Sequence, residues 1–290
     1  MIDVHAHLNF QDFAKDYRQV VKKSFSLGVK AIINVGANFK TSEKAVLIAQ
    51  EISFCFASVG VHPIHYNEEK FSEQNFTNII NNSNEKVVAI GETGFDYYRL
   101  PVDVMLGKAR KSQKELLISH LELAKKFALP LIFHCRGEKD DPFGAYDDLL
   151  AILEERKWRG KIQGEVHCFG GDWFLAQKFL SLGFYLGFTG NITFKNADKN
   201  LLEVVCRCPR ERILAETDCP YLAPEPFRGK RNLPHYLIYT LEKIAEIKKE
   251  PVEKIEVLLE ENSRELFKIS NSKVEGAGKN SKIKQKTFNF

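Results

Sequence analysis

The sequence has no long apolar stretch and no leader-like beginning. No run approaches the ~18 apolar residues that a membrane-spanning helix needs. The first residues, Met1 to His5, lack a basic segment followed by an apolar one, so they do not resemble a signal peptide. We therefore expect a soluble protein that stays in the cytoplasm and makes no membrane contact.

Net positive charge is missing from most of the chain. The 290 residues carry a formal charge of +4, and residues 271–290 hold five lysines against one acid, Glu275, which accounts for all of it. Broad capture of duplex DNA needs a basic face, so any nucleic-acid contact of residues 1–270 must be local. The tail, 271–290, is rich in Asn, Ser, Lys and Gly and is expected to be disordered. It is either a solubilising extension or a weak nucleic-acid tether.

Paired cysteines are also missing. None of the six cysteines forms a C-x-x-C pair. Most lie in or beside apolar runs, which indicates reduced, buried thiols in a reducing compartment. A zinc site on Cys206 and Cys208 is the alternative, although no second pair supports it.

Eight short apolar runs, rich in Val, Ile and Phe, alternate with amphipathic segments. The runs span 2–8, 30–36, 54–60, 87–92, 130–135, 163–168, 184–189 and 212–217. Helical periodicity is clearest in 116–128 and 252–268. This alternation predicts an α/β fold, a (β/α)8 TIM barrel that forms a single domain over residues 1–270. An open doubly wound sheet is the alternative, but it would carry a Gly-rich loop after its first strand, where this chain has His5 to Asn9.

Side chains that bind metals stand at the ends of these predicted strands. His5 and His7 are two residues apart on the first strand, so they point to the same side, which Asp3 shares. Four more end or follow later strands: Glu92, His134, His167 and Asp218. Active sites of such barrels lie at the carboxyl ends of the strands, so the six side chains should converge.

Each of these residues alone has an ordinary structural explanation, such as a helix cap or a hydrogen-bonded core histidine. Together they would form a dense polar cluster that is costly unless compensated, and divalent cations would compensate it. Six ligands exceed what one catalytic metal normally takes from a protein. We therefore expect two metals, with a carboxylate such as Glu92 bridging them.

Seven segments together resemble the TatD family of metal-dependent deoxyribonucleases, which belongs to the amidohydrolase-like barrels. They are His5–His7, Gly60–Pro63, Gly91–Tyr98, His134–Arg136, His167–Phe169, Glu216–Leu222 and Arg228–Asn232. The resemblance implies one metal held by His5, His7, Glu92 and Asp218, and a second held by Glu92, His134 and His167. It implies a hydrolase of DNA phosphodiester bonds, often trimming the ends of single strands, with Mg²⁺ or another divalent ion. The four histidines would also suit Zn²⁺ or Mn²⁺.

The residues suggest roles in such a reaction. Two cations would lower the pKa of a shared water, and Asp218 is placed to take its proton. His62 would orient the phosphate or assist the leaving oxygen, or else it is structural in its Pro-containing turn. Phosphate contacts are expected from Arg136, Arg228, Lys230 and Arg231 unless these form a solvated basic loop. Tyr98 could stack a base, as could Tyr97 and Tyr221, or simply pack. His65, His120 and His235 are expected to be structural or superficial.

Two positions depart from the family pattern. Gly170 stands where the family often has Ser or Thr, and Leu233 stands where an acid is usual. Neither is a predicted ligand, so they bear on substrate preference and not on metal binding. The alternative function keeps the site and changes the substrate: a metal-dependent amidase or esterase, or a D-aminoacyl-tRNA deacylase. A silent binding protein would be expected to have lost a ligand, whereas all six are present. The sequence leaves the oligomeric state open.

Overall fold

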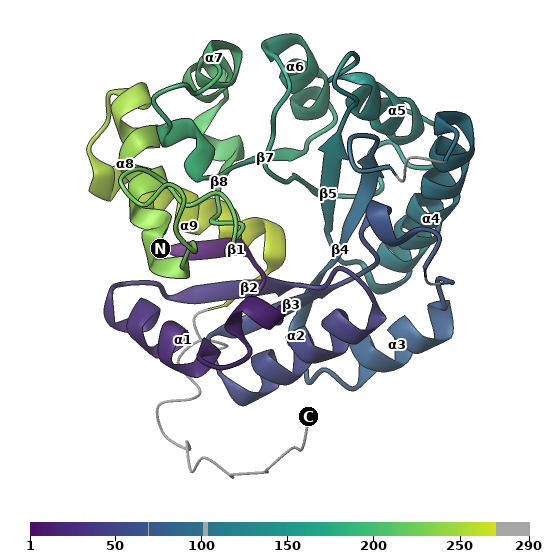
Figure 1. The fold of residues 1–290 in the computed structure, drawn as a ribbon, viewed down its shortest axis with the longest axis horizontal. Helices are drawn as coiled ribbons and strands as arrows, with labels where there is room; N and C mark the ends of the chain where they lie inside the picture. The colour runs from purple at the N-terminus through teal and green to yellow at the C-terminus, as the bar shows by residue number, and fades with distance from the viewer. Residues whose placement is uncertain (69, 101–103, 271–290) are drawn as a thin grey trace.

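The computed structural model describes residues 1–68, 70–100 and 104–270. Eight parallel strands form one sheet in the order of the sequence, with helices arranged around its outside (Figure 1). The strands are β1 Ile2–Ala6, β2 Ala31–Val35, β3 Cys55–Val59, β4 Val87–Asp96, β5 Leu131–Arg136, β6 Gly164–Val166, β7 Tyr185–Phe188 and β8 Ile213–Ala215. The (β/α)8 barrel is confirmed, whereas the predicted tail, 271–290, lies outside the described residues.

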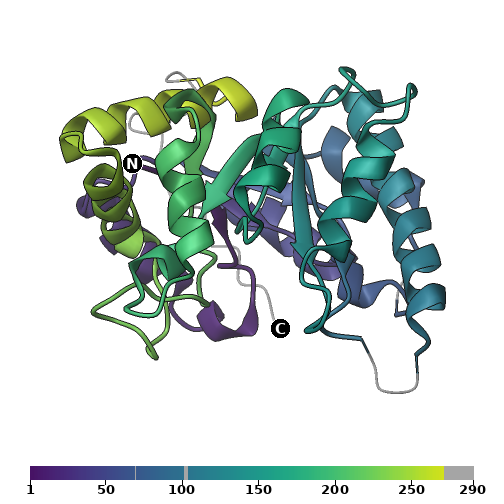
Figure 2. The same cartoon turned by 90° about the horizontal axis from the view of Figure 1, so that it is seen from above.

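The longer helices alternate with these strands (Figure 2). They are α1 Tyr17–Ser26, α2 Phe39–Glu51, α3 Glu73–Asn81, α4 Leu106–Phe127, α5 Gly144–Leu153, α6 Trp173–Ser181, α7 Lys199–Arg207, α8 Leu237–Lys248 and α9 Val252–Phe267. Across the parts of the chain that the structure describes, none of them is at once long enough and apolar enough to traverse a bilayer.

The barrel closes where the segment after β8 meets β1. Ala6 pairs with Cys219 in an isolated parallel bridge. The amide of His7 donates to the carbonyl of Cys219, and the amide of Asp218 donates to the carbonyl of His5, both at 2.8 Å. This seam brings Asp218 beside the His5–His7 segment, although more than 200 residues separate them along the chain.

Strand β4 extends four residues beyond the predicted end at Glu92. It continues to Asp96, and its register against β5 shifts between Ile90 and Thr93. Gly91 and Gly94 have φ of +145° and +140°, and a Cβ on either would run into the backbone of β5. These glycines therefore let β4 approach β5 closely, which places Glu92 and Asp96 on either side of His134.

Buried apolar residues form two clusters. The larger joins the strands to the helices around them, and its fully buried side chains include Phe13, Phe76 and Phe179. The smaller joins strand residues such as Ile33 to Phe267 at the end of α9. Burial on this scale supplies the main stabilisation of the fold. The buried polar groups at the strand ends, by contrast, lower its stability unless they are compensated.

Candidate metal centre

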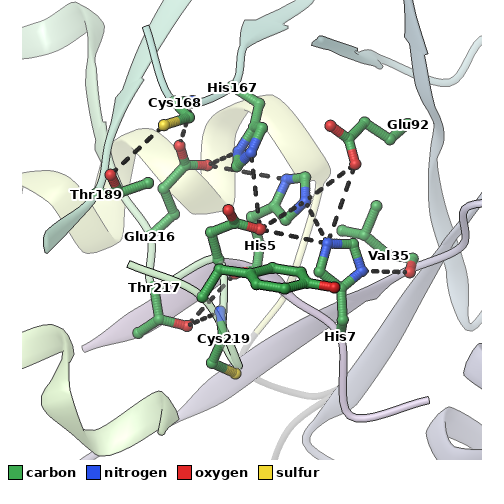
Figure 3. Close-up of polar contacts among 12 residues, drawn as sticks. His5, His7, Val35, Glu92, His167, Cys168, Thr189, Glu216, Thr217 and Cys219 are labelled. Atoms are coloured by element: carbon green, nitrogen blue, oxygen red, sulfur yellow. Dashed lines mark hydrogen bonds and ion pairs between the residues drawn. The ribbon is translucent and has the colours of Figure 1, made fainter. Parts of the chain in front are cut away.

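The imidazoles of His5 and His7 meet in a T-shaped arrangement at the mouth of the barrel, with their ring planes 77° apart. Their Nε2 atoms are 3.2 Å apart, and Glu92 Oε2 lies 3.5 Å from His5 Nε2 and 4.0 Å from His7 Nε2 (Figure 3). All three side chains are at least 95% buried. Because this set converges ring nitrogens and a carboxylate oxygen in a buried space, it fits a divalent cation.

A backbone contact orients His7 for this role. His7 Nδ1 lies 3.0 Å from the carbonyl of Val35, so Nδ1 carries the proton and donates it to that oxygen. Phe10 stacks on the same ring, with centroids 4.3 Å apart. His7 is therefore held with the lone pair of Nε2 facing His5 and Glu92.

Asp218 and His167 complete this side of the cluster. Asp218 Oδ1 lies 3.3 Å from His7 Nε2, 3.8 Å from His5 Nε2 and 3.9 Å from His167 Nε2. The ring of His167 stacks on that of His5 at 3.5 Å. Although burial alone would raise the pKa of Asp218, the nearby imidazoles of His7, His167 and His5 lower it. Asp218 is therefore a carboxylate and a proton acceptor at neutral pH.

The other oxygen of Glu92 faces a second group of side chains. Oε1 lies 2.7 Å from His134 Nδ1 and 3.6 Å from His62 Nε2, and His134 Nε2 lies 3.0 Å from Asp96 Oδ2. Burial would raise the pKa of Glu92, but the surrounding imidazoles, beginning with His62 and His134, hold it well below its usual range. Glu92 is therefore ionised, with one oxygen toward each group.

His62 and His134 differ in protonation. Burial and the proximity of His134 hold the pKa of His62 well below its usual range. His62 Nδ1 accepts the amide of Ile64 at 3.1 Å, so the neutral ring carries its proton on Nε2, toward Glu92. Burial would lower the pKa of His134 as well, but hydrogen bonds with Asp96 and Glu92 raise it.

Three further carboxyl groups that are not among the predicted site residues lie close to the site. Glu216 Oε2 lies 2.9 Å from His167 Nδ1 and 4.0 Å from His5 Nδ1. Both oxygens of Glu165 are buried without a hydrogen-bond partner, and burial together with Glu216 raises its pKa well above the usual range. Burial also raises the pKa of Asp3 to about 7, against hydrogen bonds from Thr217. A sequence signal existed, because Glu165 and Glu216 stand two residues before His167 and Asp218.

The structure thus gathers the six predicted ligands but groups them differently. Four sets of side chains could hold an ion among the described residues: His5–His167–Asp218, His5–His7–Glu92, His62–Asp96–His134 and His5–Glu165–Glu216. His167 clusters with His5 and Asp218, and His134 with His62 and Asp96, so the set Glu92–His134–His167 is not found as one cluster. Asp96 was missed because the strand was predicted to end at Glu92.

The predicted substrate-binding residues are spread more widely. The guanidinium of Arg136 stacks on Tyr98, at 4.1 Å from the ring centroid, and Tyr98 is 55% exposed. Arg228 donates to Asn196 at 2.7 Å and stacks on Phe194. Arg231 pairs with Asp16 at 2.6 Å, and the ammonium of Lys230 lies 5.8 Å from the ring centroid of Phe227. Two of the four basic residues therefore already have polar partners within the protein.

The cysteines do not form a metal site of their own. All six are free, with Cys206 exposed and Cys208 buried. None of the possible ion-holding groups in the described ranges includes a cysteine, so nothing here favours the alternative zinc site on Cys206 and Cys208.

Comparison with known proteins agrees with this geometry. A family described as TatD related DNase matches residues 2–268. An uncharacterized metal-dependent hydrolase of Bacillus subtilis, YabD, is 38% identical over 93% of this chain and 100% of its own. The 3'-5' ssDNA/RNA exonuclease TatD of Salmonella typhimurium is 31% identical over 93% of this chain and 99% of its own. The solved structure of the Escherichia coli TatD homolog YJJV superposes with a TM-score of 0.80 at 27% identity, covering 93% of this chain and 98% of its own.

Proposed function

This chain belongs to the TatD family and is a metal-dependent hydrolase acting on ester bonds, and from that premise we propose that it cleaves the phosphodiester bonds of DNA, trimming the ends of single strands. The observation that carries the proposal is the convergence of four imidazoles and two carboxylates at the mouth of the barrel. The exonuclease named among its relatives supports the choice of a nucleic-acid substrate.

The donor set suits two divalent cations, Mg²⁺ for turnover, with Zn²⁺ or Mn²⁺ also accommodated by the imidazoles. His5, His7, Asp218 and Glu92 Oε2 would hold one, with His167 beside them. Glu92 Oε1 and His134 would hold the other, with Asp96 behind His134. Support for Glu92 as the bridge is that its two oxygens face different imidazoles, at 3.5 Å from His5 and 2.7 Å from His134. Bound cations would lower the pKa of water and neutralise charge on the phosphate.

The protein's own groups account for proton movement and orientation. Asp218 is 15% exposed against 5% for Glu92, so it is the more accessible of these two carboxylates, and it would take the proton from the attacking water. His62 presents Nε2–H and would donate to a phosphate or leaving oxygen. Glu216 would hold the ring of His167, as an outer partner of a ligand does.

The test compares substrates on one purified protein. We expect labelled single-stranded DNA to be shortened from an end when Mg²⁺ or Mn²⁺ is present, and no cleavage after treatment with a chelator. Aminoacyl-tRNA and simple amides or esters serve as competing substrates, because the same site could attack a carbonyl carbon. Turnover of an acyl substrate without cleavage of DNA would refute the proposal.

Glu92→Gln tests the bridging role while keeping the size of the side chain. Losing a direct ligand should cost more than the ~10–100-fold that losing an outer partner typically costs. Glu203→Gln, which removes an exposed carboxylate paired with Arg207, is the matched control and should retain activity. Full activity of the Glu92→Gln protein would show that this residue does not bridge.

A further inference from the structure

A cavity of about 380 Å³ opens beside the metal centre, at the carboxyl ends of β1 and β2. The segment after β1 forms one wall through Asn9 and Phe10, and the start of α2 forms the other through Lys40 and Lys44. Both walls follow strands whose ends contribute to the site, so the cavity lies on the functional face of the barrel.

Shared contacts join this cavity to the centre. Phe10, which lines it, stacks on His7 at 4.3 Å. Asn9 donates from Nδ2 to the carbonyl of Val35 at 3.0 Å, and His7 Nδ1 donates to the same oxygen. A ligand in the cavity would therefore be separated from the ring of His7 by a single side chain, that of Phe10.

The charge of the cavity is unbalanced. Lys40 and Lys44 are four residues apart on α2, and Lys44 is half-buried. Burial and the like charge of Lys40 lower the pKa of Lys44. Within residues 1–68, 70–100 and 104–270, neither ammonium has a carboxylate within 4.0 Å, although Asp12 lines the same cavity. Two ammonium groups against the single carboxylate of Asp12 give the lining a net positive charge, which favours an anionic ligand.

The start of α2 directs that ligand to the lysine side chains. Asn38 Oδ1 accepts the amide of Thr41 at 2.8 Å, and Thr41 Oγ1 accepts the amide of Asn38 at 2.9 Å. This capping box uses backbone donors that an anion would otherwise contact. Recognition would depend on the two ammonium groups, which act as flexible point charges suited to a phosphate.

We propose that this cavity is a second phosphate site, in which Lys40 and Lys44 hold the phosphate of a nucleotide next to the bond being cleaved. The inference rests on the proposed function and deepens it, because it makes a strand with at least two phosphates the preferred substrate. The metal centre would bind the scissile phosphate and the lysines its neighbour along the strand.

The test combines a double variant with chemically altered substrates. Lys40→Gln/Lys44→Gln is compared with the wild type on short single strands that carry one neutral methylphosphonate at successive linkages from the end. In the wild type, neutralising one particular linkage should lower kcat/KM about tenfold, and the variant should lose that sensitivity. The variant should also raise KM for the unmodified strand and reduce the slope of log affinity against log salt by about 0.7, for the one phosphate that the two lysines neutralise together.

Lys125→Gln/Lys161→Gln is the matched control. It removes the same charge from two exposed lysines that precede β5 and β6, at the opposite end of the barrel. The control should bind and cleave as the wild type does. A variant that keeps the wild-type KM, salt slope and methylphosphonate sensitivity would overturn the inference.

Binding separates this inference from the proposed function. Fluorescence anisotropy with a cleavage-resistant phosphorothioate strand measures how much the two lysines contribute to binding, without requiring turnover. If the wild type binds the strand more tightly than the double variant but cleaves no DNA, the proposed function fails and the second phosphate site stands. If DNA is cleaved equally by both proteins and bound equally by both, the second site fails and the proposed function stands.

Discussion

His120, on α4, offers a test in which a buried hydrogen bond and a titration can be separated. Its Nε2 accepts the amide of Val61 at 2.9 Å, and its Nδ1 donates to the carbonyl of Leu116 at 2.8 Å. The side chain is fully buried, and burial lowers its pKa to about 4. Since Val61 precedes His62, this contact anchors the turn that carries a candidate catalytic side chain.

Replacing His120 by Leu leaves the buried amide of Val61 unpaired, which should cost about 1–3 kcal/mol at pH 8. The pH dependence adds a second effect. The folded-state pKa of about 4 lies below the unfolded value near 6.5, so as pH falls the unfolded chain binds the proton first. The wild type therefore loses stability between pH 6.5 and 4, by about 3 kcal/mol in all. The Leu variant lacks this loss.

The difference in the free energy of unfolding between the wild type and the Leu variant should therefore shrink as the pH falls. Urea unfolding of both proteins at constant ionic strength, from pH 8 to pH 4, measures it. His120→Gln is the control, because its amide can accept from Val61 without titrating in this range. It should resemble the wild type at pH 8 and lack the loss of stability at low pH. A gap between the wild type and the Leu variant that stays constant over the whole range would refute the reasoning.

Two further predictions concern the site. Asp96→Asn removes a carboxylate whose hydrogen bond raises the pKa of His134. Metal affinity, measured by competition with a chelator, should fall about 10–100-fold, and unchanged affinity would assign His134 another role. Arg231→Gln should leave the KM for DNA unchanged, because Arg231 already forms a partly exposed ion pair with Asp16. Loss of that pair should lower the free energy of unfolding by only about 0.2–1 kcal/mol. A KM raised severalfold would instead support the phosphate contact predicted from the sequence.

The sequence was sufficient to predict the barrel and the convergence of the six side chains. Both follow from local rules, the alternation of apolar runs with amphipathic segments and the position of polar residues at strand ends. Strand alternation also placed His5 and His7 on one side without any knowledge of long-range contacts.

Asp96 could not be predicted in the same way. The segment Gly91-Glu92-Thr93-Gly94 resembles the end of a strand because glycine weakens strands. In the structure these glycines allow close pairing with β5, a contact between segments about 40 residues apart. The lysine cavity depends likewise on α2 packing beside the segment after β1. The pairing of Arg231 with Asp16 spans more than 200 residues and has no local signal.

The histidines of the site differ in role because each uses one ring nitrogen for a separate contact. The carbonyl of Val35 accepts a hydrogen bond from Nδ1–H of His7, which leaves a lone pair on Nε2. The amide of Ile64 donates to Nδ1 of His62, which leaves a proton on Nε2. Both Nε2 atoms face Glu92, at 4.0 Å and 3.6 Å, yet in these tautomers His7 presents a lone pair there and His62 presents an N–H. The backbone around each ring therefore sets its tautomer, and with it whether Nε2 offers a lone pair or a proton.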